Sequence, residues 1–255
     1  MTFITLTTDL GKNNYNIASL KGAILSLAPE SQLIDISNEI NNFDIVEGTF
    51  MLANSYKFFP KGTIHVIAIN SFYAQKVRIL LLQKEEYYFI APDNGILSLL
   101  FENIENDNIR YYEYGNANGD LYTVIAKMIA EISIGKKSPE IGIKADNITK
   151  KIYLKPVVSG NSIRATVIFI DKFGNAILNV TKDLFEQNSK DKNFKLIYSP
   201  KNSINNIYNK YSDIPYGDEL CLFNSAGYLE IAVNMGNASE ILGLEKGSVV
   251  QIIFE

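Results

Sequence analysis

Ile168-Phe-Ile-Asp-Lys-Phe-Gly-Asn-Ala-Ile-Leu-Asn179 is the stretch that says most about the fold of this 255-residue chain. Apolar residues on both sides indicate two strands, and the polar segment between them indicates a turn in which Gly174 lets the backbone bend sharply. The turn would carry a carboxylate (Asp171), an aromatic ring (Phe173) and an amide (Asn175) within five residues. These groups suit a cationic small molecule that contains a base. The alternative is an ordinary hairpin turn with Phe173 in the core.

Short β-runs dominate the chain from about residue 155 onward. One short helix is predicted at Ala238 to Leu242, with Asn237 as its N-cap and Gly243 at its end. Lys201–Lys210 is polar and is predicted to be an exposed loop. The predicted strands are Ser162–Ile170, Asn175–Val180, Phe194–Tyr198, Glu219–Phe223, Tyr228–Val233 and Val249–Phe254. Strands at this spacing predict a compact antiparallel barrel or sandwich.

The first 150 residues alternate strands with helices, which predicts an α/β layer structure. An apolar run, Phe3 to Thr8, stops at Asp9, and Asn14 then leads into a helical pattern that begins at Ile17. A strand, a polar turn and a helix start form the usual ligand position at the carboxyl edge of an α/β sheet. Asp9 is either an acceptor for two ribose hydroxyls or a turn or capping acid, and the residues alone leave both open.

Further elements of this α/β region are marked by local signals. Asp44 and Asp120 are predicted N-caps of two helices, the first of which is expected to end near Phe59. Val77–Leu82 and Tyr87–Ala91 are predicted to form a hairpin.

Composition excludes several classes of protein. A net charge of −4 without a basic stripe argues against nucleic-acid binding, and no apolar run approaches the ~20 residues of a membrane span. Cys221 is the one cysteine of the chain, so an internal disulfide and a Cys-rich zinc site are excluded. His65 is the one histidine and lies in a β-run, where a hydrogen-bonded structural histidine is favoured over a catalytic one. Together with an N-terminus that lacks a basic signal region, this predicts a soluble, cytoplasmic protein.

Six motifs, in this order, resemble one family. They are Thr7-Thr-Asp-Leu-Gly11, Lys21-Gly22, Phe59-Pro-Lys-Gly62, Ala91-Pro-Asp-Asn-Gly-Ile-Leu-Ser98, Ile170-Asp-Lys-Phe-Gly-Asn175 with Asn179, and Phe223-Asn-Ser-Ala-Gly-Tyr-Leu-Glu-Ile-Ala232. The chain is similar to the S-adenosylmethionine hydroxide adenosyltransferases, a family that includes S-adenosylmethionine-dependent chlorinases and fluorinases. The resemblance runs from residue 2 to 254 and favours the ligand-site interpretation of the 168–179 stretch.

The resemblance implies an architecture and a reaction. The fold class would be α/β, with an N-terminal α/β domain (residues 1–155), a linker (156–162) and a smaller C-terminal antiparallel β-barrel domain (163–255). The family forms homotrimers that bind the ligand at the subunit interface. Its members displace methionine from C5′ of the ribose with hydroxide from water or with a halide. S-adenosylmethionine is the substrate, and no cofactor is implied.

Site residues follow from the matching motifs. Asp9, with Asn14 nearby, would bind the ribose, Asp171 the methionine ammonium, and the Asn224-Ser225 pair the methionine carboxylate. Phe173 would pack on the adenine and Asn175 would bind its edge. The segment that contains Ala238 would offer backbone groups to the base, and Tyr211 would supply a second stacking ring.

The chain departs from the family at the reacting centre. Hydrolysing members carry an Asp-Arg-His trio, but the matching positions here are Asn70, Val77 and Ala117, with Arg78 one place from the second. An amide has no basic site near neutrality, and loss of a proton acceptor typically costs ~10²–10⁴ in rate. Asn70 and Asn118 would hold the water, Arg78 would be the cation, and Tyr73 would form an apolar wall.

Two functions therefore remain open from the sequence. One is a hydrolase that converts S-adenosylmethionine to adenosine and methionine, slowed by the replaced trio. The other is a non-catalytic protein that binds S-adenosylmethionine or adenosine. A halogenase is a third and more distant alternative, because no halide pocket is apparent.

Overall fold

A computed structural model describes the chain except for residues 72–77, 105–108, 116–118 and 191. The chain divides into two compact units, Met1–Tyr153 (unit 1) and Leu154–Glu255 (unit 2). The predicted linker, residues 156–162, lies within unit 2, where Val157–Ser159 pairs with the following strand. No helix in the described ranges is long and apolar enough to cross a membrane.

Unit 1 is a mixed α/β unit. Its described residues form a seven-stranded sheet in the order β2-β1-β3-β5-β4-β6-β7, in which β2, β1, β3 and β5 are parallel and the remaining pairs are antiparallel. Its strands are β1 (Thr2–Thr8), β2 (Ser31–Ser37), β3 (Ile64–Ala68), β4 (Arg78–Lys84), β5 (Tyr87–Pro92), β6 (Ile109–Glu113) and β7 (Ile143–Lys144). Its helices are α1 (Tyr15–Leu27), α2 (Ile45–Ala53), α3 (Ile96–Leu100) and α4 (Leu121–Ser133), with short 3-10 turns at Tyr56–Phe58 and Ser138–Glu140.

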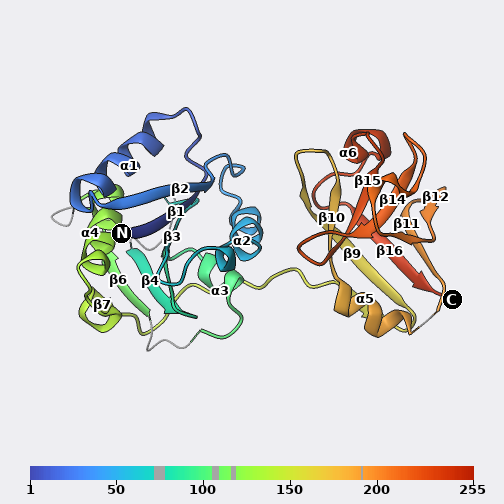
Figure 1. The fold of residues 1–255 in the computed structure, drawn as a ribbon. Helices are drawn as coiled ribbons and strands as arrows, with labels where there is room; N and C mark the ends of the chain where they lie inside the picture. The colour runs from blue at the N-terminus through green and yellow to red at the C-terminus, as the bar shows by residue number, and fades with distance from the viewer. Residues whose placement is uncertain (72–77, 105–108, 116–118, 191) are drawn as a thin grey trace. The chain divides into compact units, whose positions relative to one another are not determined.

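Helices cover both faces of this sheet (Figure 1), and an apolar layer lies beneath the helices on each face. α1 and α4 pack on one face and α2 and α3 on the other, as alternating side chains of a strand require. In β4, Ile79 and Leu81 join the α1–α4 layer, whereas Leu80 and Leu82 join the α2–α3 layer. Because β2, β1, β3 and β5 run parallel, their carboxyl ends lie at the same edge of the sheet.

Unit 2 is built on one curled sheet. In the part that the structure describes, the strand path is β12-β11-β16-β9-β10-β15-β14-β13, and β8 also pairs with β9. The strands are β8 (Val157–Ser159), β9 (Ser162–Ile170), β10 (Ala176–Thr181), β11 (Phe194–Ser199), β12 (Asn202–Ile204), β13 (Ile207–Tyr208), β14 (Glu219–Phe223), β15 (Tyr228–Val233) and β16 (Val249–Phe254). The helices are α5 (Lys182–Ser189) and α6 (Ala238–Leu242), with a 3-10 turn η5 at Tyr211–Asp213.

β9 belongs to both halves of the unit 2 sheet. Residues 162–166 pair with β16, whereas residues 167–170 pair with β10. Among the described strands of unit 2, β13 and β14 pair in parallel and the other pairs are antiparallel. The inward side chains of both halves enclose one core that includes Val167, Leu178, Ile231 and Ile252. Closure of this sheet into a barrel stays a prediction.

The predicted strands and caps are largely present. The polar segment 201–210 was wrongly expected to be a loop, because β12 and β13 lie within it. α5 was not predicted, although Thr181 caps it by accepting a hydrogen bond from the Leu184 amide. α2 ends at Ala53 rather than near Phe59, and a separate 3-10 turn follows it.

Candidate functional site

A pocket of about 180 Å³ opens at the carboxyl ends of β1 and β3 in unit 1. Three predicted site residues, Asp9, Asn14 and Asn70, lie together in its wall. The described lining residues are Asp9, Leu10, Asn14, Asn16, Asn42, Phe43, Asn70 and Ser71. The pocket therefore occupies the edge of the sheet where α/β folds usually bind ligands.

The carboxylate of Asp9 joins two loops to the end of β1. Its Oδ2 accepts hydrogen bonds from the backbone amides of Phe43, 2.9 Å away, and Asn70, 3.0 Å away. Both donors have a left-handed backbone, with φ of 67° at Phe43 and 51° at Asn70. Such a backbone is unfavourable for a bulky residue like Phe. Asp9 thus holds two left-handed loop positions in the wall of the pocket, of which Phe43 is the strained one because asparagine adopts this backbone readily. Its role in binding ribose hydroxyls stays a prediction.

Asn14 and Ser71 complete the polar wall. Asn14 is the N-cap of α1, and its Oδ1 accepts a hydrogen bond from the Asn16 amide at 3.1 Å. Ser71 is 2% exposed, and its Oγ has no hydrogen-bond partner among the residues that the structure describes. The Tyr114 hydroxyl donates to the backbone carbonyl of Ser71 at 2.7 Å. Sequence reasoning missed Ser71, although it directly follows Asn70.

Arg78, predicted to be catalytic, is held in an ion pair at the start of β4. Its Nε donates to Oδ2 of Asp93 at 2.6 Å, and its Nη2 donates to the Asn147 carbonyl at 2.5 Å. The guanidinium also lies 4.9 Å from the ring centroid of Tyr111. Arg78 does not line the pocket of Asp9, so a catalytic role for it stays a prediction. Tyr73 and Asn118 lie outside the described residues.

The turn between β9 and β10 in unit 2 is organised by Asp171. Its Oδ1 accepts from the Phe173 amide at 2.8 Å and from the Asn175 amide at 2.9 Å, and its Oδ2 accepts from Asn175 Nδ2 at 3.0 Å. Asn175 is buried, whereas Phe173 is 76% exposed. The alternative of Phe173 in the core is therefore wrong. An exposed ring beside a hydrogen-bonded carboxylate is available to a ligand.

Tyr211 and Asn224 are linked through a residue that sequence reasoning missed, Glu230 of β15. The Tyr211 hydroxyl donates to Glu230 Oε1 at 2.8 Å, and Asn224 Nδ2 donates to Glu230 Oε2 at 3.1 Å. Burial raises the pKa of Glu230, the hydrogen bonds from Tyr211 and Asn224 lower it, and the charge of Asp171 raises it. An acidic residue inside the apolar run of β15 was the available sequence signal.

The predicted residue Ser225 adjoins this cluster, whereas Ala238 belongs to a helix that contacts the Asp171 turn. Ser225 is exposed in the turn between β14 and β15, next to Asn224. Ala238 is buried at the start of α6, whose Ser239 amide donates to the Gly174 carbonyl at 2.8 Å. A Cβ atom at Gly174 would lie 1.9 Å from Oδ1 of Asn237, the N-cap of α6. Glycine at 174 therefore allows the Asp171 turn to pack directly on α6.

Family profiles match both units. The profile of the SAM hydroxide adenosyltransferase N-terminal domain matches residues 4–140, and that of the C-terminal domain matches residues 165–251. The chain belongs to this SAM hydroxide adenosyltransferase family.

Relatives match over nearly the whole length. An (R)-S-adenosyl-L-methionine hydrolase from Methanocaldococcus jannaschii is 31% identical, covering 98% of this chain and 95% of that protein. A fluorinase from an Actinoplanes species is 24% identical, covering 98% of this chain and 96% of that protein. The crystal structure of a conserved protein from Thermotoga maritima matches with a TM-score of 0.81 and 26% identity, over 99% of this chain and 100% of that one.

Within the family, the residues predicted from the motifs form two groups. Asp9, Asn14 and Asn70 gather in the unit 1 pocket. In unit 2, Asp171, Phe173 and Asn175 share one turn, and Tyr211 and Asn224 share Glu230. Among the described residues, no three His, Cys, Asp or Glu side chains gather as metal ligands would.

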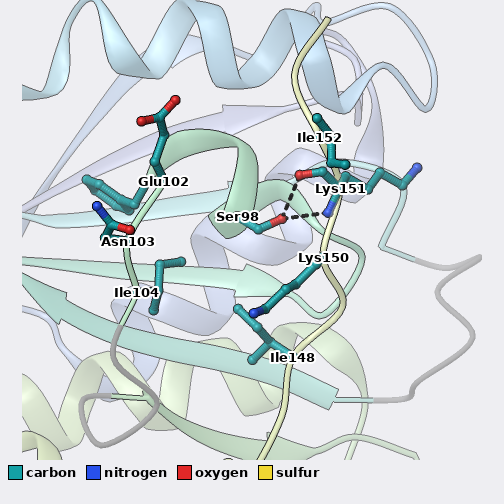
Figure 2. A pocket seen from close by; sticks show the side chains of 9 residues that line it. Ser98, Glu102, Asn103, Ile104, Ile148, Lys150, Lys151 and Ile152 are labelled. Carbon is teal, nitrogen blue, oxygen red and sulfur yellow. Dashed lines mark hydrogen bonds between the residues drawn. The ribbon is translucent and has the colours of Figure 1, made fainter.

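A larger pocket, of about 470 Å³, contains none of the predicted residues (Figure 2). It lies where the segment 148–152 passes α3, and Ser98 Oγ accepts there from the Lys151 amide at 2.8 Å. Figure 2 shows Glu102 and Asn103 on one side of the pocket and Ile148 and Lys150 on the other. Its charged side chains, Glu102, Lys150 and Lys151, are exposed at the surface, and Ser98 is the one described lining residue that belongs to a family motif.

Proposed function

We propose that this protein is an S-adenosyl-L-methionine hydrolase, which converts S-adenosyl-L-methionine and water to adenosine and L-methionine. The observation that carries this proposal is the match, at 31% identity over 98% of the chain, to a protein named (R)-S-adenosyl-L-methionine hydrolase. S-adenosyl-L-methionine is the substrate, and we propose no further cofactor.

The proposed substrate contacts use both groups of residues. In unit 1, Asp9 and Asn14 would bind the ribose hydroxyls, since a carboxylate and an amide both accept hydrogen bonds. In unit 2, Phe173 and Tyr211 would stack on the adenine, and Asn175 and the backbone near Ala238 would bind its edge. Asp171 would bind the methionine ammonium, and Ser225 beside Asn224 its carboxylate. Charged hydrogen bonds at both ends of the amino acid fix its orientation.

The reaction is a displacement at C5′ of the ribose. The water oxygen forms a bond to C5′, the C5′–S bond breaks, and its electron pair stays on sulfur as methionine leaves. The sulfonium loses its charge in this step, so a pocket with little water favours the transition state. A proton must also leave the attacking water, and it passes to solvent water because Asn70 offers no basic group to accept it. We therefore propose slow hydrolysis that depends mainly on positioning, with Asn118, Arg78 and Tyr73 as the other predicted participants.

Chromatography of adenosine and methionine tests this proposal. Purified protein is incubated with the (R) and (S) sulfonium epimers in ¹⁸O-labelled water, with heat-inactivated protein as the background. Saturable formation of adenosine that carries ¹⁸O at its 5′ hydroxyl is expected. If the product appears without the label, water is not the nucleophile and the proposal is wrong.

Asn70→Asp sharpens the test because it restores a proton acceptor in the pocket. We expect turnover to rise by up to ~10²-fold. Asn42→Asp is the matched control, since it adds the same charge to the lining of the same pocket at a position outside the family trio. An equal rise in both variants would mean that charge alone, and not the trio position, matters.

One observation favours a second candidate, a non-catalytic binder of S-adenosylmethionine or adenosine. Asn70 contributes its backbone amide to Asp9 and replaces the family's acid with an amide. Saturable binding by calorimetry without adenosine above background would identify the binder. The calorimetric titration uses the same two epimers and adenosine.

The finer predictions on architecture and assembly are part of the same proposal. We propose that the curled sheet of unit 2 is the smaller barrel domain of residues 163–255, that the α/β domain is residues 1–155, and that residues 156–162 join them. We also propose a cytoplasmic homotrimer that holds the ligand at the subunit interface and binds neither nucleic acid nor membrane. Light scattering during size-exclusion chromatography measures the oligomeric state.

A further inference from the structure

We propose that Glu230 is a positioning residue, which fixes Tyr211 and the Asn224–Ser225 turn in the orientation that binds the substrate. This inference rests on the proposed function, because it concerns how the unit 2 residues reach S-adenosyl-L-methionine. No predicted substrate contact is assigned to Glu230 itself. Its effect would pass through the two side chains that it binds.

Both carboxylate oxygens of Glu230 are used, and each is bonded to a different element. Glu230 lies within β15 and is 2% exposed. Oε1 accepts from the Tyr211 hydroxyl of η5, 2.8 Å away, and Oε2 accepts from Nδ2 of Asn224, 3.1 Å away, at the end of β14. A buried carboxylate is retained only where hydrogen bonds offset the loss of water. One side chain on a rigid strand thus ties two surface segments together.

The side chain of Asn224 is held in one orientation, with its amide nitrogen directed at Glu230. Its Oδ1 accepts from the backbone amides of Ala226 at 3.0 Å and Tyr228 at 3.1 Å. Rotating the side chain by 180° would place Nδ2 against these two donors, so Nδ2 must face Glu230. The turn is closed further by the Gly227 amide, which donates to the Asn224 carbonyl at 2.9 Å. Ser225 lies inside this closed turn, so its position follows from that of Asn224.

Tyr211 is held from two sides in a similar way. Tyr211 is 43% exposed as a residue, while its hydroxyl donates to the buried Glu230. The backbone of η5 is held by Asp213, whose Oδ2 accepts from the amides of Asn209 at 3.1 Å and Lys210 at 3.0 Å. The backbone contact places the residue, and the bond to Glu230 sets the direction of the ring. A stacking platform needs that direction because aromatic contacts depend on geometry.

Glu230 is also electrostatically close to the Asp171 turn. Burial is the largest cause that raises the pKa of both Glu230 and Tyr211. The hydrogen bond and charge of Glu230 raise the pKa of Tyr211 further, and the charge of Asp171 raises both. Glu230 therefore bonds directly to Tyr211 and Asn224, and it lies within electrostatic range of Asp171. Disturbing Glu230 should weaken contacts to parts of the substrate that are remote from C5′.

Steady-state kinetics of three variants test the inference. Glu230→Ala removes both bonds and is expected to raise KM at least about tenfold, with kcat within about threefold, because remote binding is lost. Tyr211→Phe keeps the ring, removes only the hydroxyl, and is expected to raise KM by a smaller factor. In the Glu230→Ala background, Tyr211→Phe should have no further effect, since contacting residues are not additive. Glu186→Ala, on the exposed face of α5, is the control and should leave KM unchanged.

Glu230→Gln separates geometry from charge. The glutamine oxygen can accept from Asn224, and its amide nitrogen can donate to the Tyr211 oxygen after that hydroxyl turns. We expect KM within about threefold of that of the unaltered protein, because both hydrogen bonds are kept. A large rise in KM would be expected instead if the variant lost its fold or if the negative charge itself were required. A KM as high as that of Glu230→Ala would overturn the positioning role.

The outcomes distinguish this inference from the proposed function. If the unaltered protein binds S-adenosyl-L-methionine without turnover, the dissociation constant from calorimetry replaces KM for the same variants. Unchanged KM or dissociation constant in both Glu230→Ala and Tyr211→Phe overturns the inference and leaves the proposed function standing. Absence of binding and turnover in the unaltered protein overturns both.

Discussion

Replacing Arg78 with methionine separates a structural role from a catalytic one. Arg78 has a side chain that is 14% exposed, and its partner Asp93 has a side chain that is fully buried. The substitution removes the Nε and Nη2 contacts to Asp93, the bond to the Asn147 carbonyl and the contact with Tyr111. Methionine retains much of the apolar stem but none of the charge.

The magnitude follows from leaving a buried carboxylate without its cation. Breaking a buried ion pair by removing one partner costs about 3–5 kcal/mol. Asp93 keeps the amide of Thr149, which donates to its Oδ1 at 2.7 Å, so we expect the lower half of that range. Arg78→Lys, which keeps the charge but not the forked geometry, should lose less. A double variant, Arg78→Met with Asp93→Asn, should lose less than the sum of the single variants, because no buried charge remains.

Urea unfolding followed by far-ultraviolet circular dichroism measures the free energy of unfolding. Hydrogen exchange of the Thr149 amide reports whether the transition belongs to unit 1. Adenosine formation is measured on the same samples below the transition. Suppose the free energy of unfolding of Arg78→Met lies within about 0.5 kcal/mol of that of the unaltered protein, as for a surface substitution, while turnover falls. The buried-pair reasoning would then be wrong, and the catalytic prediction for Arg78 would stand.

Three further predictions concern other parts of the fold. Burial lowers the pKa of His65 from 6.5 to about 4. As the pH falls below 6.5, the imidazole is protonated in the unfolded chain but not in the folded one. The free energy of unfolding should therefore fall by about 3 kcal/mol between pH 6.5 and about 4. Urea unfolding across pH 4–7 checks this, with His65→Phe expected to flatten the dependence. Gly174→Ala should destabilise unit 2 by more than about 1–2 kcal/mol, because φ is 84° and the new Cβ meets Asn237. Calorimetric unfolding should show a smaller loss for Gly160→Ala, whose Cβ would meet open space. Asp9→Ala should release the amides of Phe43 and Asn70, and faster hydrogen exchange at both is expected, whereas unchanged exchange would mean that Asp9 does not hold these loops.

Local signals in the sequence located the starts of three helices, although the end of α2 was misplaced and α5 was missed. Asp44, Asp120 and Asn237 were predicted as N-caps, and each accepts a hydrogen bond from the third residue of its helix. A cap involves atoms that are three residues apart, so the sequence contains the whole interaction. The Asp171–Asn175 turn was predictable for the same reason, because its carboxylate binds amides two and four residues away.

Interactions between distant residues were not predictable in this way. β12 was mistaken for part of a loop because its polar, asparagine-rich sequence has no strand pattern. The strand forms through hydrogen bonds to its partner β11. Arg78 was considered only for catalysis, since nothing in its own neighbourhood indicates that Asp93 lies against it. Glu230 was overlooked because Tyr211, 19 residues away, reaches it only in the folded sheet.

The single oxygen of Asp9 that gathers the Phe43 and Asn70 amides has a thermodynamic consequence. These two positions are 34 and 61 residues from Asp9, so the loss of conformational entropy at this wall occurs during folding and not when a ligand arrives. A nucleoside would meet a preorganised surface, and rigid sites retain more of their contact energy as affinity. Association should therefore be governed by diffusion and desolvation, without a slow ordering step at this wall.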